Sequence, residues 1–189
     1  MKKTISGFVF FLLPFIGLSQ TWSLDKAHAK AGFTVTHNLI SEVDGYFKRF
    51  DASIASSKPD FSDAVFEMSA ETASINTENE MRDGHLKGDN FFDAPKFPVL
   101  SFKSTSFSKV SGNKYKMTGN LTIKGITKPV TMDVTLLGPN IDERSKKQIL
   151  GIKATTTIDR QHFKVGTSLA AKTVADEVEL RATGEFKQN

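Results

Sequence analysis

Cysteine is absent from the 189 residues of the chain. Its absence excludes disulfides, thiol chemistry and cysteine-ligated metals, so stability has to come from core burial and sheet closure. A strong charge of one sign is also missing, since the formal net charge is +4. The lysines are scattered and mostly alternate with apolar positions, which is typical of a solvated sheet face. We therefore expect no nucleic-acid partner.

Signatures of catalysis and of cofactor binding are missing as well. The chain has no G-x-S-x-G elbow, no P-loop and no dinucleotide fingerprint. His28, His37 and His162 have neither helical nor alternating-strand spacing to a second histidine, so no metal site is predicted. We expect no cofactor, and no motif positively indicates an enzyme.

A long apolar run occurs at the N-terminus, where Ile5–Leu18 follows a short basic start. Small residues at Gly17 and Ser19 fit the −3 and −1 positions of a cleavage site, which predicts a signal peptide over residues 1–19. Pro14 and Gly17 interrupt the run and argue against an uncleaved anchor. We expect an exported, periplasmic protein.

Cleavage after residue 19 would leave 170 of the 189 residues. The net charge would fall to +2, because Lys2 and Lys3 leave with the signal peptide. A chain of this length suits one domain with a sizeable core, which we expect over residues 20–189.

Alternation of apolar and polar residues with a period of two predicts strands with one dry and one wet face. It is clearest over residues 114–137, where two alternating runs flank Gly125 and predict a hairpin with Pro129 as the first residue of the returning strand. Further strands are predicted around residues 31–35, 43–47, 66–70, 100–102, 150–158 and 177–187. About eight strands predict an antiparallel barrel or sandwich, and closure is favoured because it leaves no exposed edge.

An eight-stranded barrel is either filled by its own side chains or holds one small ligand. The inward positions combine small residues, such as Gly119 and Ala182, with large ones, such as Phe33 and Phe102. Such a mixture either interdigitates into a solid core or leaves an apolar tunnel. Taken alone, the pattern slightly favours a filled core.

The charged segment 74–98 interrupts the strands and surrounds the pair Phe91–Phe92. Thr77 and Glu80 match a capping box, and Gly88 matches a left-handed residue after a helix. We therefore expect a short helical insertion near residues 78–93, with the helix over residues 78–87, across one end of the barrel.

The same segment raises the question of catalysis. His85 would act as a general base with Asp83 or Asp89 as its orienting carboxylate, and Arg82 lies beside them. Residues two apart do not face each other on a helix, which disfavours His85 with Asp83. Gly88 is expected to end the helix before Asp89, so a structural role for these charges is favoured.

Several motifs in the chain resemble those of the YceI-like family of exported lipid- and polyisoprenoid-binding proteins. They span almost the whole predicted mature chain and include Trp22-x-Leu24-Asp25-x-x-His28, Phe33-x-Val35-x-His37, Gly45-x-Phe47-x-x-Phe50, Ser74-Ile75-Asn76-Thr77, Arg82-Asp83-x-His85-Leu86-Lys87, Asp89-x-Phe91-Phe92-Asp93, the run from Leu121 to Val130, and Asp159-Arg160-x-x-Phe163. Ala29 and Asn76 depart from the residues usual in the family, Ser and Asp, which affects local hydrogen bonds and not the fold.

The resemblance implies an extended, lipocalin-like, eight-stranded antiparallel β-barrel. Its interior would hold a long apolar chain, such as a polyisoprenoid, an isoprenoid quinone or a fatty-acyl amphiphile, which favours a tunnel over a filled core. Our leading hypothesis is a periplasmic carrier of such a lipid without catalysis. The alternatives are an enzyme acting on such a lipid through His85, Arg82 and Asp83, and a structural barrel with a filled core.

The predicted ligand-binding residues are apolar side chains on inward faces and in the insertion: Phe33, Val35, Phe47, Phe50, Phe66, Met68, Phe91, Phe92, Phe102, Met117, Leu121, Ile123, Met132 and Val134. The expected partner is the lipid itself. Transient contact with a membrane and formation of a homodimer are open partner hypotheses.

Overall fold

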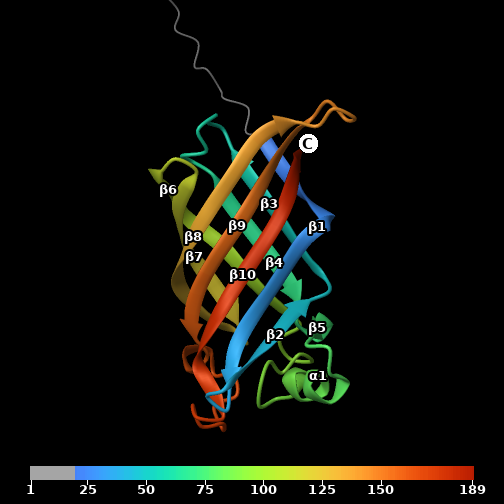
Figure 1. Cartoon of the computed structure of the whole chain (residues 1–189), viewed down its shortest axis with the longest axis vertical. Helices are drawn as coiled ribbons and strands as arrows, with labels where there is room; N and C mark the ends of the chain where they lie inside the picture. The colour runs from blue at the N-terminus through green and yellow to red at the C-terminus, as the bar shows by residue number, and fades with distance from the viewer. Residues whose placement is uncertain (1–19) are drawn as a thin grey trace, which may run out of the picture.

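The computed structural model describes residues 20–189, so the predicted signal peptide lies outside the described residues. Antiparallel strands close into an eight-stranded barrel (Figure 1). Of the barrel and the sandwich that the alternation left open, the barrel is confirmed, as the family resemblance implied. The strands are β1 (Gln20–His37), β2 (Ser41–Phe47), β3 (Phe50–Ser56), β4 (Val65–Glu71), β5 (Ile75–Asn76), β6 (Val99–Ser111), β7 (Lys114–Ile123), β8 (Ile126–Ile141), β9 (Gln148–Asp159) and β10 (Val174–Gln188). Pairing of β10 with β1 closes the ring.

Ten labelled strands occupy eight positions in the wall because two positions are each divided in two. Residues Gln20–Ser23 of β1 pair with β3, whereas Gly32–His37 pair with β2, so β2 and β3 share one position. Strands β4 and β5 flank the short 3₁₀ helix η1 (Thr72–Ser74) in the same way, since they pair with β3 and β2 respectively. Strand β3 and the first half of β1 were not predicted.

The hairpin of β7 and β8 turns at Lys124 and Gly125, which both have positive φ angles, +52° and +72°. Two such residues in succession match the right-handed twist of the strands they join. Gly125 is also required because a Cβ atom there would lie 2.7 Å from the ring of Phe97. Pro129 lies inside β8 and not at its first residue, in a stretch whose register pairs with β7 alone. A proline is tolerated there because no second ladder needs its N–H.

One end of the barrel has a filled core. Trp22 is fully buried and packs on Phe61 with a ring-centroid distance of 5.8 Å. Phe107 stacks on Tyr115 at 4.5 Å and also contacts Phe66. The interdigitated core that the residue pattern favoured therefore exists at this end, which also carries the C-terminus (Figure 1).

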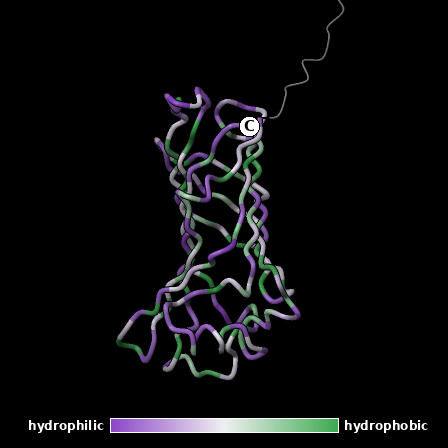
Figure 2. The backbone as a smooth tube through the Cα atoms, turned by 90° about the vertical axis from the view of Figure 1, so that its right-hand side faces the viewer, coloured by the Kyte–Doolittle hydropathy of each residue, from purple (hydrophilic) through white to green (hydrophobic). Residues whose placement is uncertain are grey.

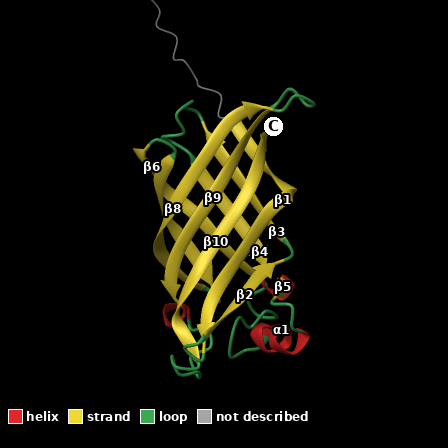
Figure 3. Cartoon of the chain, in the orientation of Figure 1, coloured by secondary structure: helices red, strands yellow, loops and turns green. Residues whose placement is uncertain are grey.

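All helical segments lie at the opposite end, which is the wider of the two (Figures 2 and 3). We call it the mouth. It carries helix α1 (Glu80–Lys87), the 3₁₀ helix η2 (Arg160–Phe163), the β1–β2 turn and the β9–β10 connection. No helix in residues 20–189 is long and apolar enough to cross a bilayer.

The insertion forms as predicted, but its helix begins two residues later. Asn79 is the N-cap and accepts a hydrogen bond from the Arg82 amide. Thr77 does not cap the helix, because its amide and hydroxyl both donate to the Asp83 carboxylate, at 2.8 and 2.6 Å. Gly88 has a φ of −72° and is not left-handed, so the expectation for this residue was wrong.

Candidate functional site

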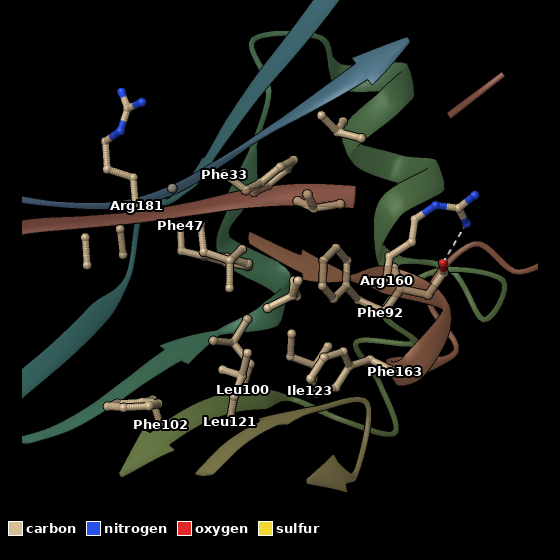
Figure 4. A pocket seen from close by; sticks show the side chains of 18 of the residues that line it. Phe33, Phe47, Phe92, Leu100, Phe102, Leu121, Ile123, Arg160, Phe163 and Arg181 are labelled. Carbon is tan, nitrogen blue, oxygen red and sulfur yellow. Dashed lines mark hydrogen bonds between the residues drawn. The ribbon is translucent and has the colours of Figure 1, made fainter. Parts of the chain in front are cut away.

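An apolar cavity of about 140 Å³ lies inside the barrel at the mouth. Figure 4 shows Phe33, Phe47 and Phe92 on one side of it, facing Leu121 and Ile123. Apart from Arg160 and Arg181, every side chain in its lining is apolar. Cavities of about this size lined by Leu, Ile and Phe stay dry and bind small hydrocarbons instead. The chemistry of this lining selects an apolar ligand.

A second cavity of about 80 Å³ lies deeper in the barrel. Six residues line both cavities: Ala31, Met68, Phe102, Met132, Ala154 and Ala182. Two of the six are methionines, Met68 and Met132, whose unbranched side chains can adapt to irregular spaces. The two cavities are therefore neighbours along the inside of the barrel.

The structure brings the predicted site residues together with one exception. Val134 is buried in the wall and lines neither cavity. The first cavity is lined by Phe33, Val35, Phe47, Met68, Phe91, Phe92, Phe102, Leu121, Ile123 and Met132, and the second adds Phe50, Phe66 and Met117.

Several lining residues were not predicted, among them two groups. Val178, Leu180 and Ala182 of β10 alternate cleanly, so their inward face was recognised without being assigned to a site. Phe163 and Val165 lie in and after η2, where no periodicity marks a face. For this second group, Phe163 in the Asp159–Phe163 motif was the available signal, and Val165 had none.

The insertion closes part of the mouth. The ring of Phe92 meets Phe47 edge-on, with centroids 6.1 Å apart. The Gly166 amide donates to the Asn90 carbonyl at 2.8 Å, which joins the insertion to the β9–β10 connection. The Lys124 ammonium donates to a carbonyl of each segment, Asp89 at 2.5 Å and Lys164 at 3.2 Å. Three segments distant in the sequence therefore form one rim.

Arg160 is the one buried charged side chain in the cavity lining, with 4% of its surface exposed. Its guanidinium also pairs with Asp176 at 2.8 Å. All three nitrogens donate to backbone carbonyls, namely those of Ala175, Val165, Gly166, Leu169 and Val174. A guanidinium has five N–H donors, so none is left for a ligand. Arg160 organises the β9–β10 connection at the mouth, and Arg181 points away from the cavity (Figure 4).

The His85, Arg82 and Asp83 cluster is divided by the helix. Arg82 donates to the hydroxyl and the carbonyl of Thr77, at 2.8 and 2.9 Å, and Asp83 accepts from the same residue. His85 is exposed to solvent on α1 and does not line either cavity. Arg82 and Asp83, both bonded to Thr77, therefore stabilise the start of helix α1.

Within residues 20–189, Asp25, His28 and Glu185 form a group with metal-ligand chemistry. The Lys187 ammonium already donates to Asp25 at 2.6 Å, and His28 Nδ1 lies 3.2 Å from the same carboxylate. The hydrogen bond from Lys187, followed by those from His28 and the Ala27 amide, lowers the pKa of Asp25 to about 2. The group is therefore organised as an ion-pair cluster between β1 and β10.

Comparison with known families gives a match over residues 22–186, the whole barrel, to the family described as the YceI-like domain. The chain belongs to the YceI-like family. Among its relatives, UPF0312 protein SAS2572 of Staphylococcus aureus is 33% identical over 169 residues, which cover 87% of this chain and 96% of that protein. The family predicted from the motifs is thus confirmed.

Solved structures with the same architecture align with almost the whole barrel. Burkholderia cenocepacia BcnA aligns with a TM-score of 0.77 at 27% identity, covering 86% of this chain and 98% of that one. The Campylobacter jejuni YCEI protein aligns at 0.74 and 36% identity, covering 88% and 96%. A polyisoprenoid binding domain from Saccharophagus degradans shares the fold, at a TM-score of 0.66 and 13% identity, with 89% and 98% covered.

Proposed function

We propose that this YceI-like protein is a periplasmic carrier that holds a long apolar chain, of the isoprenoid or fatty-acyl type, inside its barrel. The observation that carries the proposal is the pair of cavities walled by apolar side chains, one of which lies at the mouth. The fold of the Saccharophagus degradans domain, which is described as polyisoprenoid binding, is consistent with it.

The energetics of the cavity favour such a ligand. Each methylene moved from water into an apolar interior contributes about 0.8 kcal/mol. A chain that fills the first cavity and displaces Met68 and Met132 would also reach the second. Its polar head would stay at the mouth, because the buried guanidinium of Arg160 has its donors occupied.

Binding without catalysis fits the geometry better than an enzyme does. A general base must lie within hydrogen-bond reach of the proton that it removes. His85 is exposed on α1, outside both cavities, and the donors of Arg82 and the carboxylate of Asp83 are directed at Thr77. A ligand chain in the tunnel would not meet these three groups.

Titration of the purified protein with fluorescent fatty-acyl and prenyl probes tests the proposal. We expect saturable binding of both types, with affinity that rises with chain length until the two cavities are filled. Absence of saturable binding with every chain would refute the carrier function. Consumption of the probe into a new product would favour the enzyme alternative instead.

A further inference from the structure

Two loops project from the mouth and touch each other. They are the β1–β2 turn (residues 38–40) and the β9–β10 connection (residues 164–173), which we call the mouth loops (Figure 1). The Asn38 amide of the first loop donates to the Thr173 carbonyl of the second at 2.9 Å. Within the second loop, the Thr173 amide donates to the Ala170 carbonyl at 2.8 Å. The two loops therefore present one continuous surface.

The tip of the first loop exposes two large apolar side chains. Leu39 is 70% exposed and Ile40 is 88% exposed, the highest value among the large hydrophobic residues of the described chain. Leu39 also has a φ of +62°, in the left-handed region that disfavours a residue with a Cβ atom. A glycine or asparagine would suit this turn better. Folding alone therefore does not account for Leu39 and Ile40.

The second loop brings positive charge to the mouth. Residues 164–173 contain Lys164 and Lys172, both exposed, and no Asp or Glu. Ala170 and Ala171, also exposed, precede Lys172. Exposed apolar side chains and lysines at the same end of the barrel, with no acidic residue in this loop, complement a bilayer surface that bears anionic head groups.

The first mouth loop is anchored next to the cavity lining. His37, immediately before the turn, pairs with Val174, immediately after the β9–β10 connection. Val174 and Val35 both line the first cavity. An acyl or prenyl chain leaving a membrane at the tip would therefore reach lining residues of the cavity close to the turn.

We propose that the mouth loops dock the protein on an anionic lipid bilayer, with Leu39 and Ile40 inserted among the acyl chains. The inference rests on the proposed carrier function, because it explains how a nearly insoluble ligand enters the cavity without crossing water. It identifies a bilayer, and not a second copy of this chain, as the occupant of this surface.

Matched double substitutions test the docking. Leu39→Ser with Ile40→Ser removes the apolar tip, whereas Leu137→Ser with Ile141→Ser removes two side chains that are 54% and 60% exposed in and at the end of β8, away from the mouth. Binding is measured by flotation with vesicles of phosphatidylcholine containing phosphatidylglycerol. Loss of two inserted side chains lowers vesicle binding about tenfold or more, and the control pair leaves it unchanged.

Two further readouts separate the docking from the carrier function. Uptake of a detergent-solubilised fatty-acyl probe stays the same in the Leu39→Ser, Ile40→Ser protein, while transfer of that probe from vesicles slows. Equal vesicle binding by wild type and both variants overturns the docking, even if the probe still binds. A shift from dimer to monomer in the mouth variant, with vesicle binding unchanged, assigns the surface to a second copy and also overturns it.

The absence of cysteine allows a direct measurement of insertion. A solvent-sensitive fluorophore is attached to single cysteines introduced as Ile40→Cys and Ile141→Cys. Addition of the same vesicles shifts the emission of the first to shorter wavelength and leaves the second unchanged. Equal shifts at both positions, or no shift at either, contradict insertion through the mouth loops.

Discussion

Replacing Arg160 should unfold the mouth rather than merely weaken ligand binding. The side chain is buried and supports the η2 segment and the connection to β10 through bonds to five carbonyls and Asp176. Arg160→Ala leaves those carbonyls without their charged donor. If about three to five of them remain buried at about 1 kcal/mol each, the free energy of unfolding falls by about 3–5 kcal/mol.

Thermal and urea unfolding, followed by circular dichroism, measure this loss. For a domain of this size each kcal/mol lowers Tm by about 2–4 °C, so we expect a fall of about 10 °C. Arg160→Lys keeps the charge but replaces a rigid fork by a single ammonium, and should recover less than half of the loss.

Arg181→Ala is the matched control. Arg181 also lies at the cavity wall, but its side chain is largely exposed and pairs with Glu179 at 2.7 Å. Exposed ion pairs contribute about 0–1 kcal/mol, so its stability should change little. The reasoning is refuted if Arg160→Ala unfolds like the wild type while losing affinity for lipids with anionic heads, since Arg160 would then be a ligand for the head group.

Three further predictions concern the cavity, the helix and the acid stability. Ala154 lines both cavities, so Ala154→Phe should place a ring in them and lower probe affinity about tenfold or more with Tm retained. Val134→Ala, outside both cavities, should lower Tm and leave affinity intact. His85→Ala should change neither probe affinity nor Tm, because the side chain is exposed. A clear fall in either would contradict this, and loss of a probe turnover shown by the wild type, with binding retained, would favour the enzyme alternative. The pKa of Asp25 is lowered in the folded state from 3.8 to about 2. The ionised carboxylate therefore stabilises the folded state above pH 3.8, and this stabilisation is lost as the pH falls through about 2. In the Asp25→Asn variant, the free energy of unfolding should therefore fall less steeply between about pH 4 and pH 2 than in the wild type. The same pH dependence in both proteins, measured by equilibrium unfolding, would count against the Lys187 pairing.

Period-two alternation was enough to predict the strand faces of β7 and β10 because each has one side in the barrel and one in water. Strand β3 was not predicted because its inward positions include Ala52 and Ser56, which are little more hydrophobic than the outward residues between them. The start of α1 was misplaced because Thr77, a good cap by composition, is bonded to Asp83. Long-range partners of this kind are not visible in local propensity.

The hollow interior was harder to predict than the barrel. Inward Phe, Met and Ala residues are compatible with a filled core, and at the end that contains Trp22 and Phe107 they form one. The shape of the cavity at the mouth depends on the positions of the Phe92 and Phe163 side chains, and both residues lie outside the regular strands. Their positions depend on bonds between segments far apart in the sequence, such as that from Gly166 to Asn90.

Native mass spectrometry of the purified protein, followed by organic extraction, tests the central claim most directly. The account predicts a bound lipid of the prenyl or fatty-acyl type that is released by the solvent and is reduced or absent in the Ala154→Phe variant. Protein that is consistently empty, and that takes up no quinone, prenyl or fatty-acyl chain when these are supplied, would contradict it.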